Sequence, residues 1–223
     1  MIGKGIITKD RIRQLMKESP PLIDEKDKPQ REKCLKGASY DLRLGQEYIK
    51  EGRFGKLDDE KNPYLEIPEH DVVVVSTFEN INMPNRLTGR FGLRLSFAMK
   101  GLVLNNEPQI DPGYEGKLFC ILYNLSDQPI IIRYLERFAT IEFQTTDSAA
   151  PPYGRGFEHI FDVVKDRIPK SGLRELRDQF QKLREDVERR LDRFYTLFFT
   201  AIAIVIAILG IIVARVLLFP PNS

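Results

Sequence analysis

The chain has 223 residues, of which 34 are basic and 32 acidic, so its formal net charge is only +2. This balance provides no basic surface of the kind that nucleic-acid binding requires, and we expect no nucleic-acid partner. Cys34 and Cys120 are the only cysteines, which excludes a disulfide framework and a cysteine zinc site and favours a reduced, cytosolic setting. The isolated histidines, His70 and His159, are expected at the surface, not as ligands or catalytic bases.

Residues 1–165 have the pattern of one β-rich globular domain. A helix is expected over Thr8–Lys17, and short apolar segments separated by turn residues follow it. Such a succession predicts a mainly β fold, either a barrel or a double-sheet jelly roll. The sequence contains no glycine-rich phosphate loop of the Walker or Rossmann type. The expected strands are Val72–Thr77, Gly101–Leu104, Lys117–Tyr123, Pro129–Arg133 and Phe138–Phe143.

The segment Gln109–Gly116 combines an acid, a tight turn and an aromatic ring. Pro112-Gly113 favours a sharp backbone turn. Asp111 can position a water molecule or a sugar hydroxyl, and Tyr114 offers a flat ring with a hydroxyl group. By spacing alone, an ordinary hairpin turn explains the segment equally well, so a ligand site here depends on the neighbouring residues.

Residues 166–194 are expected to form a charged helix that acts as a stalk, beginning near Pro169–Gly172. Apolar residues recur at 3-4-3-4 spacing over about three heptads, the lower limit for a coiled coil. Two alternatives remain open: an amphipathic helix that packs on its own domain, or one that lies on a membrane surface. The apolar series is Leu173, Leu176, Phe180, Leu183 and Val187, extended by Leu191 and Phe194.

Residues 195–219 are expected to form one transmembrane helix. The uncharged stretch from Tyr195 to Ala214 has about 20 residues, enough to cross ~30 Å of hydrocarbon. A buried core helix would need a larger protein around it. Arg189, Arg190 and Arg193 precede the span and Arg215 follows it, which by the positive-inside rule places the globular domain in the cytoplasm. Phe194, Tyr195 and Phe219 are candidate interface anchors.

Five segments of the domain, taken together and in order, resemble the family of dCTP deaminases and trimeric dUTPases. The resemblance covers roughly residues 5–145, and the order and spacing are closer to the deaminase branch. It implies a dUTPase-like jelly-roll or β-clip barrel and a homotrimer with three pockets at subunit interfaces. The implied ligand is a deoxynucleoside triphosphate of the dCTP or dUTP class, bound with Mg²⁺. The segments are Ala38–Gly45, Leu65–Gly89, Arg94–Leu102, Asn106–Gly116 and Glu136–Phe143.

The resemblance also implies roles for particular residues. Asp111 matches the acid that orients the attacking water in dUTPases, and it is the tentative catalytic residue. Tyr114 matches an aromatic residue beside the deoxyribose, and Gln109 lies near the base-reading edge. Arg94, Ser96 and Lys100 fall in the phosphate-binding second motif, whereas Asp41 lies in the first motif. For each of these residues, a structural role is an equally good interpretation.

Three positions depart from the deaminase pattern. The glutamate that serves as general base in deaminases falls on Ile121, and an isoleucine cannot transfer a proton. Leu95 and Met99 stand where the second motif has a serine and an arginine. The glycine-rich arm that closes over the phosphates in dUTPases is reduced to Gly154–Phe157.

These features leave three hypotheses for function. The chain is a membrane-tethered binding protein with little turnover, a working dCTP deaminase or dUTP pyrophosphatase held at the membrane, or a trimeric scaffold whose pocket is vestigial. The missing polar groups favour the first, whereas the intact Asp111–Gly116 turn favours the second.

Overall fold

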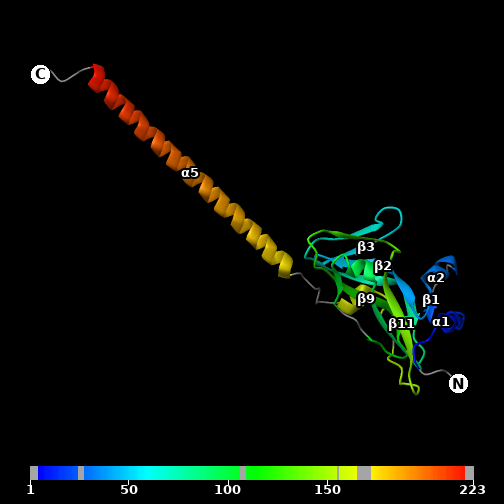
Figure 1. Ribbon diagram of the computed structural model, residues 1–223. Helices are drawn as coiled ribbons and strands as arrows, with labels where there is room; N and C mark the ends of the chain where they lie inside the picture. Colours follow the sequence, from blue (N-terminus) through cyan, green and yellow to red (C-terminus); the bar gives the residue numbers. More distant parts are fainter. Residues whose placement is uncertain (1–4, 25–27, 106–108, 155, 165–171, 219–223) are drawn as a thin grey trace. The chain divides into compact units, whose positions relative to one another are not determined.

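The computed structural model describes residues 5–24, 28–105, 109–154, 156–164 and 172–218 (Figure 1). The chain divides into two compact units, Met1–Leu173 and Arg174–Ser223, which are considered separately here. The expected boundary between domain and stalk, near residue 165, lies outside the described residues, as do Pro169, Phe219 and part of the Asn106–Gly116 segment.

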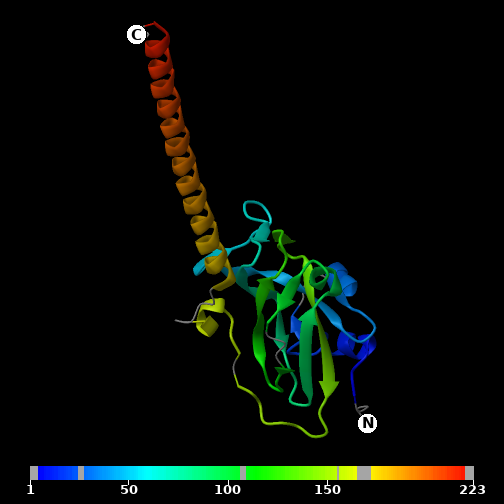
Figure 2. The same ribbon diagram turned by 60° about the vertical axis from the view of Figure 1, so that its left-hand side comes forward.

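The first unit is built on a nine-stranded sheet whose main path runs β7-β9-β5-β2-β11-β6-β8 (Figures 1 and 2). Strand β1 adds to β5 and β3 adds to β2, while β10 and β4 form a separate two-stranded sheet. The strands are β1 Ile23–Asp24, β2 Tyr40–Lys50, β3 Arg53–Lys56, β4 Tyr64–Ile67, β5 Val72–Asn82, β6 Leu87–Leu93, β7 Leu102–Leu104, β8 Gln109–Ile110, β9 Glu115–Asn124, β10 Ile130–Arg133 and β11 Arg137–Thr145. The helices of this unit are α1 Lys9–Leu15, α2 Lys28–Cys34, α3 Leu95–Ala98 and α4 Ile160–Val164.

Strand β2 joins the two halves of the sheet. Its first residues pair with β11, with Thr140 opposite Asp41, and its later residues pair with β5, with Val74 opposite Ile49. The register with β5 shifts between Leu44 and Tyr48, and such irregularities let a strand bend. The sheet therefore curves around one core without a break.

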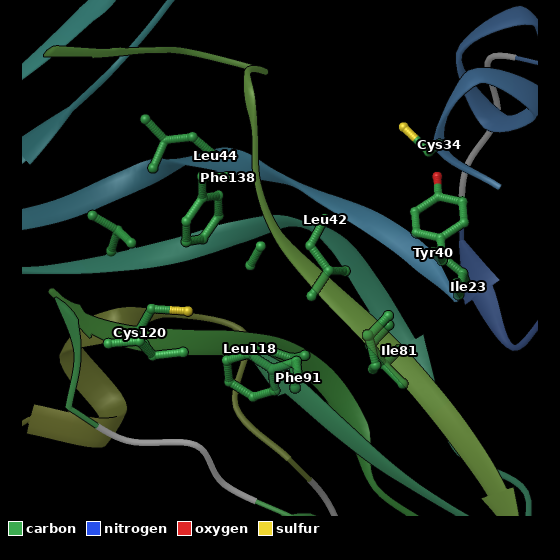
Figure 3. Packing of buried hydrophobic residues seen from close by; sticks show 14 of the residues in the cluster. Ile23, Cys34, Tyr40, Leu42, Leu44, Ile81, Phe91, Leu118, Cys120 and Phe138 are labelled. Carbon is green, nitrogen blue, oxygen red and sulfur yellow. The ribbon is translucent and has the colours of Figure 1, made fainter. Parts of the chain in front are cut away.

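The core is formed by alternate residues of the long strands. In β9, Leu118, Cys120 and Leu122 are buried, whereas Phe119 and Ile121 are only partly buried. Figure 3 shows Leu118 and Cys120 facing Leu42, Leu44 and Phe138 across the interior. Both cysteines are free and buried. Apolar burial of this extent is the main favourable term for folding the domain.

The prediction of a mainly β domain is confirmed, and α1 and all five expected strands match closely. The sequence pattern missed β2, because Asp41 and Arg43 interrupt its apolar residues although both are buried. It also missed α3, which lies in the second motif. Helix α3 begins after Arg94, whose extended backbone forms the N-cap.

The described part of the second unit belongs to one helix, α5, which spans Gly172–Leu218. The segment Asp178–Ile211 is long and apolar enough to cross a membrane. Leu176, Phe180, Leu183 and Val187 are exposed on this helix, as an apolar series without a covering partner must be. The coiled coil and the membrane crossing remain predictions.

Candidate functional site

The turn predicted at Pro112-Gly113 is present between β8 and β9. Gly113 has φ +78°, a left-handed conformation that favours glycine, and its N–H donates to the carbonyl of Met83 at 2.9 Å. The Tyr114 N–H donates to the Asp111 carbonyl at 3.2 Å and closes the turn. A side chain at Gly113 would lie 2.6 Å from Pro152. The turn is therefore held from two sides.

Asp111 and Gln109 form one polar group at this turn. The Gln109 amide Nε2 donates to Asp111 Oδ1 at 3.1 Å. Gln109 is exposed and Asp111 is half-buried. Both side chains are thus accessible to solvent, and Gln109 orients the carboxylate.

Tyr114 is packed within its own chain. Its hydroxyl donates to the carbonyl of Lys117, and its ring lies 5.8 Å from that of Tyr153, centroid to centroid. Burial raises the pKa of Tyr114 to about 12, so the phenol is neutral at physiological pH. Gly156 lies directly against the ring, where a Cβ would come within 2.8 Å of it. In this state the ring supports the turn and its face is partly covered by the segment after β11.

Arg94, Ser96 and Lys100 lie together around α3. Ser96 and Lys100 are exposed, and the Lys100 ammonium lies 5.1 Å from the centroid of the Phe97 ring. Between them, Leu95 and Met99 expose 74% and 79% of their surface. The surface of the second motif is therefore partly polar and partly apolar.

Arg94 also belongs to a group of charges that sequence reasoning did not assemble. The Asp41 carboxylate has 5% of its side chain exposed, and Lys36, Arg94 and Arg137 surround it. Asp41 was singled out by its motif, whereas Lys36 precedes that motif and Arg137, although it lies in the Glu136–Phe143 segment, was assigned no role. Only the pairing of β11 with both β2 and β6 brings them together.

The predicted site residues form two groups within one chain. Gln109 pairs with Arg90 in the β8–β6 ladder, while Arg94 follows the end of β6. Four residues of strand correspond to about 13 Å. A pocket of about 450 Å³ near Phe54 and one of about 340 Å³ near Pro84 are lined by other residues than these six. One chain thus holds the predicted residues in two separate groups.

Ile121, the position implied for a general base, lies outside the main core. It packs with Phe119 against a small cluster formed by Ile49, Val74 and Ile160. Ile160 begins α4 and has 2% of its surface exposed. The outer face of the sheet at Ile121 is therefore apolar, and Ile160 at the start of α4 covers it.

The carboxylate of Glu47 fixes that covering segment. It accepts a hydrogen bond from the Ile160 N–H at 2.9 Å and contacts His159 Nδ1 at 2.9 Å. Burial alone would raise the pKa of Glu47, but these two contacts outweigh it and lower the pKa below its ordinary value of 4.5. His159 is exposed, as expected, yet it helps to hold α4 in place.

The described residues do not form a magnesium cage. No group of three or more His, Cys, Asp or Glu side chains suited to a metal ion occurs in the parts of the chain that the structure describes. Asp111 already accepts a hydrogen bond from Gln109, and Asp41 already has three cations beside it. The Mg²⁺ that the resemblance implies therefore has no protein-built site among these residues.

Comparison of the sequence with known proteins finds similar proteins that are named dCTP deaminase. A dCTP deaminase from Pyrococcus abyssi is 38% identical over 138 residues, which cover 61% of this chain and 88% of that protein. A dCTP deaminase from Pyrococcus furiosus is 36% identical over 128 residues, 57% of this chain and 80% of the relative.

Solved structures give the same fold. The crystal structure of a dCTP deaminase from Agrobacterium tumefaciens aligns with a TM-score of 0.53 at 18% identity, covering 64% of this chain but 49% of that one. The family model described as dCTP deaminase-like matches residues 6–146, which include all six predicted site residues. The chain therefore belongs to the dCTP deaminase-like family.

Proposed function

We propose that this protein is a membrane-anchored family member that binds a deoxynucleoside triphosphate of the dCTP or dUTP class between copies of a homotrimer, with little or no turnover. The observation that carries the proposal is the apolar face at Ile121. A deaminase needs a group there that moves a proton, and loss of a general base costs roughly 100- to 10,000-fold in rate. In this chain Ile121 contacts apolar side chains and lies in the cluster closed by Ile160.

The binding half of the proposal is supported by the two separate groups of predicted site residues. Gln109 lies opposite Arg90 of β6 and contacts Asp111, whereas Arg94 follows the last residue of β6 and is held by the Arg137 carbonyl. Because the two groups lie apart in one chain, a ligand could contact both at an interface, where one copy supplies the first group and a second copy supplies the other. The symmetric trimer that the family resemblance implies would supply that copy three times.

The membrane half is supported by α5. Its uncharged stretch, which begins at Tyr195, follows Arg189, Arg190 and Arg193, so the positive-inside rule favours a cytoplasmic domain. Tethering would also raise the effective concentration of the three domains. Protease digestion of sealed, right-side-out spheroplasts should leave the domain intact, and digestion from outside would contradict this orientation.

Calorimetry on the full chain in lipid nanodiscs tests the function. Titration with dCTP, dUTP and dATP should give saturable heat for a pyrimidine nucleotide. In a separate assay, the rate of dCTP deamination should be less than a hundredth of that of an active relative. Asp111→Asn should weaken binding, whereas Asp127→Asn, at an exposed residue of the β9–β10 turn, serves as the matched control. Absence of binding by all three nucleotides would leave the trimeric scaffold as the better hypothesis.

A second function, hydrolysis of dUTP to dUMP and pyrophosphate, is favoured by the Gln109–Asp111 contact. In dUTPases the acid that Asp111 resembles orients the attacking water. Release of pyrophosphate from dUTP that disappears in Asp111→Asn would replace the binding proposal with a tethered enzyme. Chemical cross-linking of the full chain should give trimers, and a monodisperse monomer would exclude a shared pocket.

A further inference from the structure

Three cations from separate parts of the chain surround one buried carboxylate. We call Lys36, Arg94 and Arg137, together with Asp41, the basic cluster. The nitrogen atoms lie 3.6, 3.9 and 3.4 Å from Asp41 Oδ2, in the order Lys36, Arg94, Arg137. Lys36 precedes β2, Arg94 follows β6, and Arg137 begins β11. Because β11 pairs with both β2 and β6, the sheet itself brings the three together.

The cluster carries more positive charge than its carboxylate neutralises. One negative charge faces three positive ones, which leaves two in excess. All three contacts are longer than the 2.7–2.9 Å typical of a strong charge-assisted bond. The cation side chains are 43%, 32% and 38% exposed for Lys36, Arg94 and Arg137. Their outer faces can therefore meet a ligand from solvent.

Backbone carbonyls hold the three cations in position. Arg94 Nη1 donates to the Arg137 carbonyl at 3.0 Å. Arg137 Nη1 and Lys36 Nζ both donate to the Lys33 carbonyl, at 3.2 and 2.8 Å. Such anchoring reduces the entropy that three flexible side chains would lose on binding. A preorganised group with excess positive charge and two guanidinium planes suits a phosphate chain.

We propose that the basic cluster binds the polyphosphate group of the ligand directly, with Lys36 and Arg137 supplying the neutralising charge that a magnesium ion would otherwise provide. The Asp41 carboxylate lies among three cations, and their positive charge repels a magnesium ion. Polyphosphate binding is therefore independent of Mg²⁺. This inference deepens the proposed function and rests on it only for the nucleoside part of the ligand.

The first test titrates the full chain in detergent micelles with sodium tripolyphosphate, which contains no nucleoside. Binding in EDTA should be as tight as binding with excess Mg²⁺, or tighter, because Mg²⁺ reduces the ligand's negative charge. A requirement for Mg²⁺, or no binding of tripolyphosphate in EDTA, would overturn the proposal.

Charge-removing variants test the residues. Arg137→Gln and Lys36→Gln should each weaken tripolyphosphate binding roughly tenfold, the loss of one charge-assisted contact. The matched control is Arg53→Gln. Arg53 is exposed on β3 and lies opposite Lys50 at the end of β2, whereas Asp41 lies near the start of that strand. If the control and the two variants bind equally, the cluster is not the site.

The carboxylate provides a test of opposite sign. Asp41→Asn removes the competing negative charge, so tripolyphosphate should bind several-fold tighter in EDTA. If Asp41 instead held a magnesium ion, the same variant would weaken binding in Mg²⁺. A folded Asp41→Asn protein with weaker binding would overturn the proposal, and should that variant fail to fold, Arg137→Gln decides.

The two proposals fail in distinguishable ways. Tripolyphosphate binding without any preference for dCTP or dUTP over tripolyphosphate would refute the nucleotide function while leaving the cluster as an anion site. Nucleotide binding that needs Mg²⁺ and ignores Arg137→Gln would refute the cluster while leaving the nucleotide function intact.

Discussion

Strand β2 carries two ionic groups two residues apart that differ in their access to solvent. Arg43 pairs with Glu79 at 2.6 Å, with 5% and 0% of their side chains exposed, and the guanidinium also lies 4.5 Å from the centre of the Phe78 ring. Asp41, by contrast, is a buried carboxylate whose three cations reach the surface. The first group is closed and balanced, whereas the second is open and has excess positive charge.

The comparison separates stability from binding. A closed pair cannot exchange its partner for a ligand, so its value lies in the folded state, where loss of one partner leaves a buried charge. An open cluster contributes little to folding because water screens it, but it can exchange contacts with an anion. The Glu47–His159 contact is intermediate, since Glu47 is 13% and His159 67% exposed.

The largest expected effect belongs to the closed pair. Glu79→Gln leaves the Arg43 charge buried without a counterion, and we expect the free energy of unfolding to fall by about 3–5 kcal/mol. Urea denaturation of the full chain in detergent measures this free energy. Tyrosine fluorescence can follow the unfolding because the chain contains no tryptophan. The double variant Arg43→Met, Glu79→Leu is the control and should recover most of the loss. A fall below about 1 kcal/mol in Glu79→Gln would show that the pair is not closed.

The intermediate contact should give a smaller, pH-dependent effect. Glu47→Gln weakens the hydrogen bonds to the Ile160 N–H and His159, which should cost about 1.5 kcal/mol at pH 7. The pKa of Glu47 is lowered in the folded state, so its contribution is full above its ordinary value of 4.5 and is lost as the pH falls through the folded value.

Unfolding curves at pH 7 and at pH 3 check this sign. The difference between the original protein and Glu47→Gln should shrink at the lower pH. His159→Ala is the matched comparison and should cost less, because the Ile160 N–H still donates to Glu47. A difference that grows on acidification would contradict the assignment.

The smallest effect on stability is expected for the open cluster. Asp41→Asn should change the free energy of unfolding by about 1 kcal/mol or less, and the change should shrink further in 1 M salt, where the Debye length is about 3 Å. Measurement of unfolding at low and high salt tests this, with Glu79→Gln as the salt-insensitive reference. A loss as large as that of Glu79→Gln would make both groups structural.

Local patterns carried much of the fold. The valines of β5, the alternation in β9 and the apolar run in α5 each have a periodicity that the backbone geometry requires, so they were predicted from sequence. Strand β2 was missed because its buried charges resemble an exposed segment until Glu79 and the three cations are seen beside them. Helix α3 was missed because its four residues are too few to show a helical period.

The candidate site shows the same division. The motif order selected Asp111, Tyr114 and Arg94, and the turn at Gly113 follows from local chemistry. No local pattern groups Lys36 with Arg137, which are 101 positions apart, or places Ile160 against Ile121. Those contacts arise from strand pairing and from the return of the chain after β11.

The sequence by itself therefore determined which structural elements occur. These are a β-rich domain of this family, a turn with an acid and an aromatic ring, and one apolar helix. The tertiary structure alone decided which charges are buried, which are shared and which remain open. Burial and charge balance depend on neighbours distant in the chain, and electrostatic free energy depends on both. That is why Asp41 on β2 and Glu79, the partner of Arg43 on the same strand, differ in their surroundings although their residue types are nearly the same.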